Sequence, residues 1–588
     1  MTPTSETHSK YKPWYAAAAL FAAMLALSWH RWNSLIVDLG RETDMPFRLM
    51  NGEWLYRDIH YLYTPFSPYF NALLYRIFGP HLDTLAFSGV FFSILLAVLC
   101  YRIVRKLMPP VEATLAVCLV IVLCIFKPAG NLILPYSFAA LHGTVFSIAS
   151  VLFLMRFAQK PKAADLAVCG VLMGLAGLAK QEFAFAGALT VTAYLIFLHR
   201  TDLKALIGDL AIAAVPALVV FVPVIAALFA TMDARMLIDD CHLFYTNIPA
   251  SLVNYNQFRS GLNNPFSSAL QLLGSVAVCG AITAALIFFS DRTGKLKRRS
   301  AVLFAASTAF AVLVALLSIG QWDGSPIRAL PVLLVGLMAV AWLRKDGSGP
   351  LFIAAAYSLA IILRVILRVP SGGFSGSFFL PIGLCMIAYA LLVELPKYIS
   401  KWTADERSAK RALSVTRGFV AIAIVVTAIS FGYRFRTKYV YEVSAARGTA
   451  LVEKESGPVI SETLRFIEAK TAPGDFISVL PEGNDLAFLT GRRINFRHQV
   501  LLPDFLSRQD ELDAIEALKR GNVRYIFITN RPMREFGAVA FGKDFYQTLG
   551  GYIAENYRLV KTFGVPDGPE PEIGDPRYFI KAYERKDQ

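Results

Sequence analysis

The dominant pattern along the chain is a series of apolar runs separated by short polar segments. Runs of about 17–25 apolar residues are long enough to cross a bilayer as helices, and shorter runs can cross it with support from neighbouring helices. Candidate spans begin near Pro13, Thr84, Ala113, Tyr136, Asp165, Phe183, Ala205, Ser268, Ser300, Pro326, Leu351, Phe379 and Gly418. The pattern predicts a polytopic α-helical membrane protein with about thirteen transmembrane helices.

Basic residues mark alternate ends of these predicted helices. Lys and Arg are enriched in the short cytoplasmic loops of membrane proteins. Here they occupy residues 8–12, 102–106, 156–162, 200–204, 292–299, 344–345 and 397–417, whereas the opposite ends carry mixed charge. This distribution predicts an odd number of spans, with a cytoplasmic N-terminus and a C-terminus on the outer side. It also explains much of the net charge of +15, so nucleic acid is not an expected partner.

Composition changes this picture only in detail. The chain is 55% hydrophobic and 17% charged, which is far from the composition of a soluble globular protein. Its seven cysteines form no Cys-x-x-Cys pair, so neither a disulfide framework nor a zinc ribbon is expected. The chain also has no Asn-x-Ser/Thr acceptor, which favours a bacterial envelope, and thus the inner membrane, over a secretory pathway.

Two segments on the predicted outer side are much longer than a connecting turn. One is the first loop, residues 30–83, and the other follows the last predicted span. Long loops are usually functional. We therefore divide the chain into a membrane domain, residues 1–433, and a C-terminal periplasmic domain, residues 434–588.

The C-terminal segment has the pattern of a small α/β domain. Helices are predicted at 459–470 and 510–519, strands at 476–481, 524–530, 558–564 and 578–584, and a loop at 566–571. It contains no Gly-rich phosphate loop and no nucleophile elbow. We interpret it as a structural or acceptor-docking domain.

The first loop interleaves charged and aromatic side chains. Carboxylates can bind or deprotonate sugar hydroxyls, and aromatic rings can cover the apolar faces of a sugar. If residues 35–44 form a helix, Asp38 and Glu42 share one face at i and i+4, with Arg41 beside them at i+3. The alternative is an amphipathic interfacial segment whose charges meet lipid headgroups.

This loop also resembles the first outer loop of the GT-C glycosyltransferases. The resemblance is carried by the segments DLGRE (38–42), PFRL (46–49), GEWLYRD (52–58) and PFSPY (65–69). The superfamily includes the protein O-mannosyltransferases, the lipid A aminoarabinose transferase and lipopolysaccharide galacturonosyltransferases. Its many-helix plan and outer C-terminal domain are similar as well, although the sharp motif covers only about forty residues.

The resemblance implies roles for the acidic residues of the loop. In that superfamily, an acidic residue just after the first helix acts on the acceptor hydroxyl, and Asp38 matches its position. The second acidic residue would be Glu42 or Asp58. The aminoarabinose and mannosyl branches have adjacent acidic residues, whereas Leu39 and Gly40 follow Asp38 here, so the second acid stays open.

A phosphate leaving group needs cations or N–H donors for its growing charge. Candidate ligands of a donor phosphate are Arg41, Arg57, Lys180, Arg364 and Arg368. Lys180 lies in a tight turn that is either merely solvated or part of the site, and similar Lys/Arg-x-Glu turns recur in GT-C proteins close to the site. Arg368 can snorkel to the interface, whereas Arg364 lies one turn deeper and is costly there without a partner.

Five further residues are candidates for lining the substrate cavity: His60, Tyr61, Glu182, His242 and Tyr245. The last two belong to an acidic, His-containing loop at 239–249 without recognised metal-ligand spacing. We therefore expect it to shape the acceptor side. No metal site and no cofactor are predicted, and a divalent metal requirement stays open.

The resemblance implies an inverting glycosyltransferase that takes a sugar from a polyprenyl-phosphate donor. Nucleotide sugars are absent outside the cytoplasm because charged solutes cross bilayers poorly. The acceptor would be an envelope glycan, a lipid or a protein at the periplasmic face, and Asp38 would be the general base. The main alternative is a transporter or flippase, which would predict internal repeats and broken helices. An inactive scaffold and an oligosaccharide ligase are further alternatives.

Overall fold

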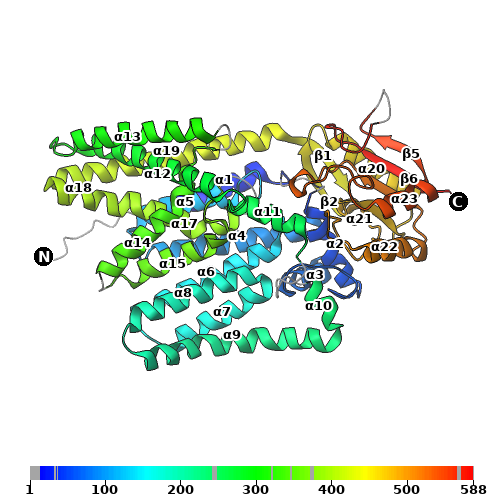
Figure 1. Cartoon of the computed structure of the whole chain (residues 1–588), viewed down its shortest axis with the longest axis horizontal. Coiled ribbons are helices and arrows are strands. Elements are labelled where there is room, and N and C mark those ends of the chain that lie inside the picture. The colour runs from blue at the N-terminus through cyan, green and yellow to red at the C-terminus, as the bar shows by residue number, and fades with distance from the viewer. Residues whose placement is uncertain are drawn as a thin grey trace.

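The computed structural model describes residues 13–31, 35, 37–240, 248–318, 322–344, 347–370, 376–565 and 571–586. The molecule is elongated, with a bundle of long helices over most of its length and a mixed α/β domain at one end (Figure 1). A group of short helices, α2 (Leu39–Met50), α3 (Phe66–Phe78) and α10 (Ala234–Asp240), lies where the two meet (Figure 1).

In the described part of the chain, nine helical segments are long and apolar enough to cross a membrane. They are α4 (Leu82–Val104), α6 (Phe138–Gln159), α8 (Gln181–His199), α9 (Leu203–Thr231), α11 (Ala250–Ser260) with α12 (Pro265–Ser290), α13 (Lys297–Ser318), a 3₁₀ turn with α14 (Leu330–Arg344), α17 (Pro381–Tyr389) with α18 (Leu395–Thr403), and α19 (Glu406–Lys438). Four shorter apolar helices join them: α1 (Trp14–Ser28), α5 (Pro110–Val120) with a π-helical turn, α7 (Ala163–Ala179) and α15 (Gly349–Ile362).

Every predicted span start lies within one of these helical segments or within two residues of it. The predicted polytopic helical fold is therefore confirmed. The number of passes through a membrane stays a prediction, because the four shorter helices need support from their neighbours to cross.

Side-chain caps fix where several helices begin. Ser137, Asp202 and Asn264 accept backbone N–H bonds at the starts of α6, α9 and α12, and Asp405 does the same for α19. Such residues satisfy N–H groups that have no partner within the helix. Polar N-cap residues between the apolar runs therefore determine where these helices begin.

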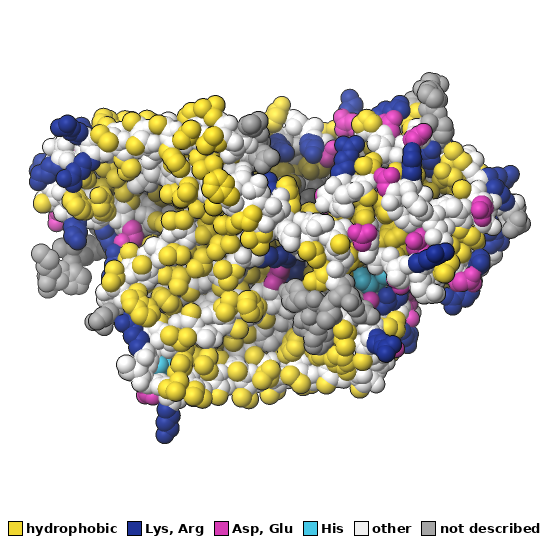
Figure 2. All heavy atoms as spheres, viewed as in Figure 1, with side chains coloured by type: hydrophobic (Ala, Val, Ile, Leu, Met, Phe, Trp, Pro, Cys, Tyr) yellow, Lys and Arg dark blue, Asp and Glu magenta, His cyan; other side chains and the backbone are white. Residues whose placement is uncertain are grey.

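Charge is distributed unevenly over the two ends of the molecule. The connections α12–α13, α14–α15 and α18–α19 lie at the end remote from the α/β domain (Figure 1). On the face shown in Figure 2, Lys and Arg gather at that end, the surface of the bundle is largely apolar, and the α/β domain carries both signs. These three predicted basic loops thus share one end, and the described parts of the two long polar regions share the other.

The C-terminal region begins with a hairpin and continues as a four-stranded sheet. The hairpin strands β1 (Tyr439–Ala445) and β2 (Gly448–Glu453) are antiparallel. The sheet has the order β3 (Ile477–Leu480), β4 (Tyr525–Thr529), β6 (Ile580–Arg585), β5 (Tyr557–Phe563), with β3 and β4 parallel and the other pairs antiparallel. The helices are α20 (Gly457–Lys470), α21 (Asp485–Thr490), α22 (Arg508–Arg520) and α23 (Gln547–Asn556).

The predicted strands and the two predicted helices of this α/β domain are all present. The hairpin β1–β2 and the helices α21 and α23 were not predicted. The hairpin continues directly from the end of α19, so no loop signal separates it from the last span. The predicted loop at 566–571 lies largely outside the described residues.

The first loop folds into α2 (Leu39–Met50) and α3 (Phe66–Phe78) and packs against the α/β domain. The helix predicted for residues 35–44 is present, although it starts at Leu39 and extends to Met50. Gly40 lets α2 approach α21 closely: a Cβ at this position would lie 2.7 Å from the backbone nitrogens of Asn484 and Asp485. The loop is therefore held between two domains rather than lying free at an interface.

Candidate active site

The backbone at Asp38 forms a tight turn immediately before α2. Its φ of 65° and ψ of −32° lie where residues other than Gly are uncommon. The Leu39 N–H donates to the Val37 carbonyl at 2.8 Å, which closes a three-residue γ-turn of the rare, strained kind. The Asp38 side chain does not cap α2. It is therefore not committed to the helix that it precedes.

Arg41 lies between the two acidic residues that the sequence placed on one helical face. Its Nη2 is 3.4 Å from Asp38 Oδ1, and its Nε is 3.4 Å from Glu42 Oε1. Arg41 Nη2 also donates to the Tyr136 carbonyl at 2.9 Å. Glu42 Oε2 accepts the Phe138 N–H, at the start of α6, at 2.9 Å. The structure thus brings together all three predicted residues of this turn.

Asp38 and Glu42 differ in accessibility. The Asp38 side chain is 28% exposed, whereas that of Glu42 is 6% exposed. Burial raises the pKa of both carboxyl groups, and Arg41 lowers it in part. A raised pKa makes a carboxylate a stronger base. Because Glu42 is held by a backbone N–H, Asp38 is the carboxylate that a substrate can reach.

A second charged cluster forms where α7 meets α8. Lys180 Nζ is 2.9 Å from Glu182 Oε1 and 4.5 Å from the centre of the Tyr63 ring. Glu182 Oε2 binds Arg364 Nη1 at 2.7 Å, and Arg364 Nη2 donates to Asn256 Oδ1 at 2.7 Å. Burial alone would lower the pKa of Lys180, but the Glu182 carboxylate raises it. Both cations are therefore charged and fixed by one carboxylate.

Tyr136 connects the two clusters. Its carbonyl accepts from Arg41. Burial raises the pKa of its hydroxyl and Lys180 lowers it, while the charges of Asp38 and Glu182 also reach this hydroxyl. The electrostatic influence of both clusters thus reaches the Tyr136 hydroxyl.

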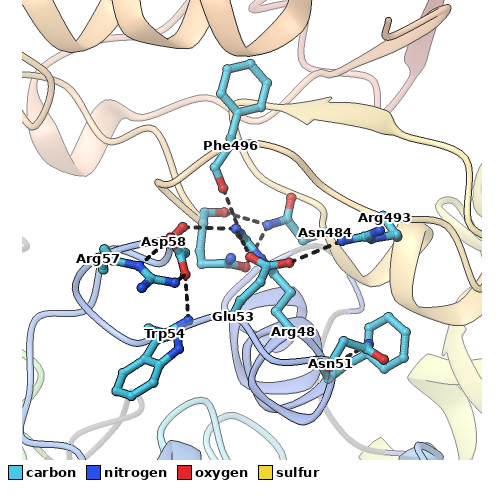
Figure 3. A network of polar contacts seen from close by, with 11 residues as sticks. Arg48, Asn51, Glu53, Trp54, Arg57, Asp58, Asn484, Arg493 and Phe496 are labelled. Atoms are coloured by element: carbon cyan, nitrogen blue, oxygen red, sulfur yellow. Dashed lines mark hydrogen bonds and ion pairs between the residues drawn. The ribbon is translucent and has the colours of Figure 1, made fainter. Parts of the chain in front are cut away.

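Arg57 and Asp58 belong to a different network (Figure 3). Arg57 Nη2 binds Asp58 Oδ2 at 2.7 Å, and the Trp54 N–H donates to the same carboxylate at 2.8 Å. The side chains are 53% and 32% exposed. The two predicted residues are thus paired with each other near the surface.

Arg48 is the centre of that network (Figure 3). Its guanidinium binds Glu53 Oε2 at 2.6 Å and donates to the carbonyls of Phe496 at 2.7 Å and Asp58 at 3.0 Å. Arg48 is buried. Because Phe496 belongs to the α/β domain, this network fastens the first loop to that domain.

The remaining candidates have various surroundings. His60 Nε2 lies 3.8 Å from Asp240 Oδ1, and its ring is 4.5 Å from that of His498. His60 and the buried Tyr61 line a small hollow together with Arg41. Arg368 donates to the Phe258 carbonyl at 3.2 Å on α11. His242 and Tyr245 lie outside the described residues.

The sequence did not indicate Glu482, which the structure adds to the site. Glu482 Oε1 accepts the Asp38 N–H at 2.6 Å, and Glu482 Oε2 binds Arg531 Nε at 3.3 Å. Glu482 follows β3, where a side chain can project from the end of a strand. Its position at the end of a predicted strand is the one signal in the sequence that could have indicated Glu482, because its partner Asp38 lies 444 residues earlier in the chain.

No group of three or more His, Cys, Asp or Glu within the described ranges has the arrangement of a metal site. Residues 241–247 of the acidic loop lie outside those ranges.

Comparisons with known proteins address the fold. A family model described as dolichyl-phosphate-mannose-protein mannosyltransferase matches residues 63–226. ArnT from Cupriavidus metallidurans bound to undecaprenyl phosphate is 12% identical, with a TM-score of 0.52 over 97% of this chain and 98% of that one. The apo oligosaccharyltransferase of Archaeoglobus fulgidus is 10% identical, with a TM-score of 0.52 over 99% of this chain and 89% of that one. No curated protein sequence matches significantly. The chain therefore has the same overall fold as these two structures, in agreement with the fold that the resemblance of its first loop led us to expect.

Proposed function

We propose that this multi-pass membrane protein is a glycosyltransferase that moves a sugar from a polyprenyl-phosphate donor to an acceptor hydroxyl. The reaction would take place at the periplasmic face of a bacterial inner membrane. The observation that carries the proposal is the geometry of the two charged clusters. The partly exposed Asp38 carboxylate lies 3.4 Å from Arg41 Nη2, which also donates to the Tyr136 carbonyl, and Lys180 Nζ is held 2.9 Å from Glu182 Oε1. The structural similarity to a protein crystallised with undecaprenyl phosphate supports the donor class.

The donor phosphate would bind at Lys180 and Arg364. Each cation is oriented by Glu182 at less than 3 Å, yet each has more N–H donors than these contacts use. Arg364 is 49% exposed, so its guanidinium is accessible to a ligand. Fixed cations stabilise the negative charge that grows on a leaving phosphate without reorganising during the reaction.

The acceptor would bind on the other side of Tyr136. The Asp38 carboxylate takes the proton of the acceptor hydroxyl as that oxygen bonds to the anomeric carbon. The bond from the anomeric carbon to the phosphate oxygen breaks, and its electron pair leaves with the lipid phosphate. Attack from the face opposite the leaving group inverts the anomeric configuration. A product with retained configuration, measured by NMR, would contradict this step.

Glu42 and Arg41 would orient the base rather than replace it. Glu42 joins the turn that carries Asp38 to the start of α6 through the Phe138 N–H. Arg41 binds both carboxylates and the Tyr136 carbonyl. Of the two candidates for a second acidic residue, Glu42 is therefore the one that belongs to this cluster.

The test is a comparison of envelope glycolipids and glycans by mass spectrometry. Cells would express wild type, Asp38→Asn, Asp58→Asn or no protein. We expect one sugar-sized mass increment with wild type and Asp58→Asn and none with the other two. If Asp38→Asn gives the wild-type profile, the assigned base is wrong. If all four profiles agree, transfer to an abundant envelope acceptor is wrong, and uptake of labelled lipid-linked saccharide into liposomes would test the transporter alternative.

A further inference from the structure

We propose that Glu482 of the α/β domain is a positioning residue that holds Asp38 in its strained turn, so that docking of this domain completes the active site. The catalytic consequence rests on the proposed function. The structural part, a turn that depends on a carboxylate from another domain, does not.

The turn needs an external partner because its own geometry is unfavourable. A non-Gly residue in a sparsely populated backbone region is strained and persists only when the surroundings over-determine it. At Asp38 the surroundings supply a charge-assisted bond, from the backbone N–H to Glu482 Oε1 at 2.6 Å. Such bonds are about twice as strong as neutral ones. Glu482 is therefore the partner that offsets the strain.

Glu482 is itself held firmly. It is 4% exposed, and its two oxygens have different partners: Oε1 accepts from Asp38, and Oε2 binds Arg531 Nε at 3.3 Å. Arg531 also binds Glu535, and Thr529 Oγ1 donates to the Glu482 carbonyl at 2.8 Å. A side chain fixed at both ends can fix the group that it touches.

Docking of the domain brings Glu482 into reach of the turn. Two residues after Asp38, the close approach of Gly40 to the start of α21 sets α2 against the domain. Further along the helix, Arg48 binds the Phe496 carbonyl of the same domain. Contacts at both ends of α2 thus keep the helix in place, and Glu482 binds the backbone N–H of Asp38, the residue just before it.

The contact should respond to pH. Burial and the nearby Asp38 raise the pKa of Glu482 to about 7. The charged groups that act on it are Asp38 and Arg41 from the first loop and Arg531 and Asp485 from its own domain. Protonation below pH 7 would remove the charge that strengthens the N–H bond. Transfer by the wild type should therefore weaken as the pH falls through about 7, and replacement of Glu482 by Gln should reduce this dependence.

The experiment uses the full-length protein with Glu482→Gln, Glu482→Ala and a matched control, Glu584→Gln. Glu584 is also buried, lies in the same domain and binds Arg524 and Arg558. The first measurement is amide hydrogen exchange of the peptide that spans the start of α2. We expect faster exchange in Glu482→Ala, an intermediate rate in Glu482→Gln and the wild-type rate in Glu584→Gln. Unchanged exchange in Glu482→Ala would overturn the proposal.

The second measurement is transfer kinetics over a range of pH. We expect kcat to fall about 10–100-fold in Glu482→Ala, since small misplacement of a catalytic group can cost that much, with KM for the donor nearly unchanged. Glu482→Gln should fall less, because an amide oxygen still accepts the N–H. Loss in Glu584→Gln as large as in Glu482→Ala would indicate general unfolding and overturn a specific role. If the wild type transfers nothing, the proposed function fails, while hydrogen exchange still decides the positioning role.

Discussion

Asp38 and Asp58 are carboxylates of the same polar loop, yet their surroundings are opposite. Asp38 lies in a strained turn between two domains, and its backbone N–H donates to the side chain of Glu482, 444 residues later in the chain. Asp58 pairs with its neighbour Arg57 near the surface (Figure 3). Burial raises the pKa of Asp38. Burial also opposes ionisation of Asp58, but the bonds from Arg57 and the Trp54 N–H lower its pKa overall.

The difference shows why residue type and loop position do not identify a base. A carboxylate that already accepts short bonds from local donors is a weak base, because those bonds favour its charged form. Among the described residues, the partly buried Asp38 carboxylate has a long contact, to Arg41 at 3.4 Å, so this carboxylate keeps its affinity for a proton. The predictions below test this contrast, beginning with the largest expected effect.

Replacing each carboxylate by its amide tests the contrast directly. Asp38→Asn should lower kcat by about 10²–10⁴-fold, the usual contribution of a general base. Asp58→Asn should stay within about threefold of wild type, since exposed ion pairs contribute little. Initial rates of sugar transfer with purified proteins measure both, and equal losses would remove the distinction between the two residues.

The cations of the two networks provide a second contrast. Lys180→Ala and Arg364→Ala should each lower kcat/KM by about 10²–10³-fold, because each removes a preorganised donor to the leaving phosphate. Arg57→Ala should change it little, since Arg57 is 53% exposed and neutralises Asp58. Steady-state kinetics with varied donor concentration distinguish these outcomes. A large loss in Arg57→Ala would show that the donor phosphate binds at Arg57 and not at Lys180 and Arg364.

Closer packing at the first turn of α2 should disturb Asp38 without touching it. Gly40→Ala would place a Cβ 2.7 Å from backbone nitrogens of α21, and such overpacking typically costs about 1–3 kcal/mol. We expect a lower midpoint of thermal unfolding in detergent together with reduced transfer.

Gly551→Ala is the control for that substitution. A Cβ at Gly551, in helix α23, meets open space, so this change should be neutral or stabilising by about 0.5–1 kcal/mol. Similar behaviour of the two variants would show that α2 and α21 do not need their close approach.

The smallest expected effect is on stability as a function of pH. The pKa of Glu482 is raised to about 7 from its usual value, so the folded state binds this proton more tightly than the unfolded state does. The charged form is the destabilised one, and the resulting loss of stability develops as the pH rises through about 7. We therefore compare the thermal unfolding midpoint of Glu482→Gln with that of wild type at each pH. The midpoint of the variant minus that of wild type should be a few degrees larger at pH 8 than at pH 5.5. A constant difference between the two midpoints would show that Glu482 does not titrate in this range.

The sequence determined the features that depend on local periodicity. Apolar runs of spanning length, divided by capping residues, specified the helical segments, and alternating strands with turn residues specified most of the α/β domain. The grouping of Asp38, Arg41 and Glu42 was also readable, because residues three and four apart lie on one face of a helix. The first turn of the helix is enough to bring them together, independently of the tertiary structure.

Only the tertiary structure decided which of the other charged residues meet that turn. Lys180, Arg364 and Asn256 lie on separate segments of the chain, and their grouping around Glu182 depends on how the helices that carry these segments pack. The way in which the α/β domain docks onto the first loop decides that Asp58 lies apart from the Asp38 cluster and that Glu482 contacts Asp38. Contacts between residues 444 positions apart leave no periodic signal in a sequence, because they are selected by shape and charge after the local elements have formed.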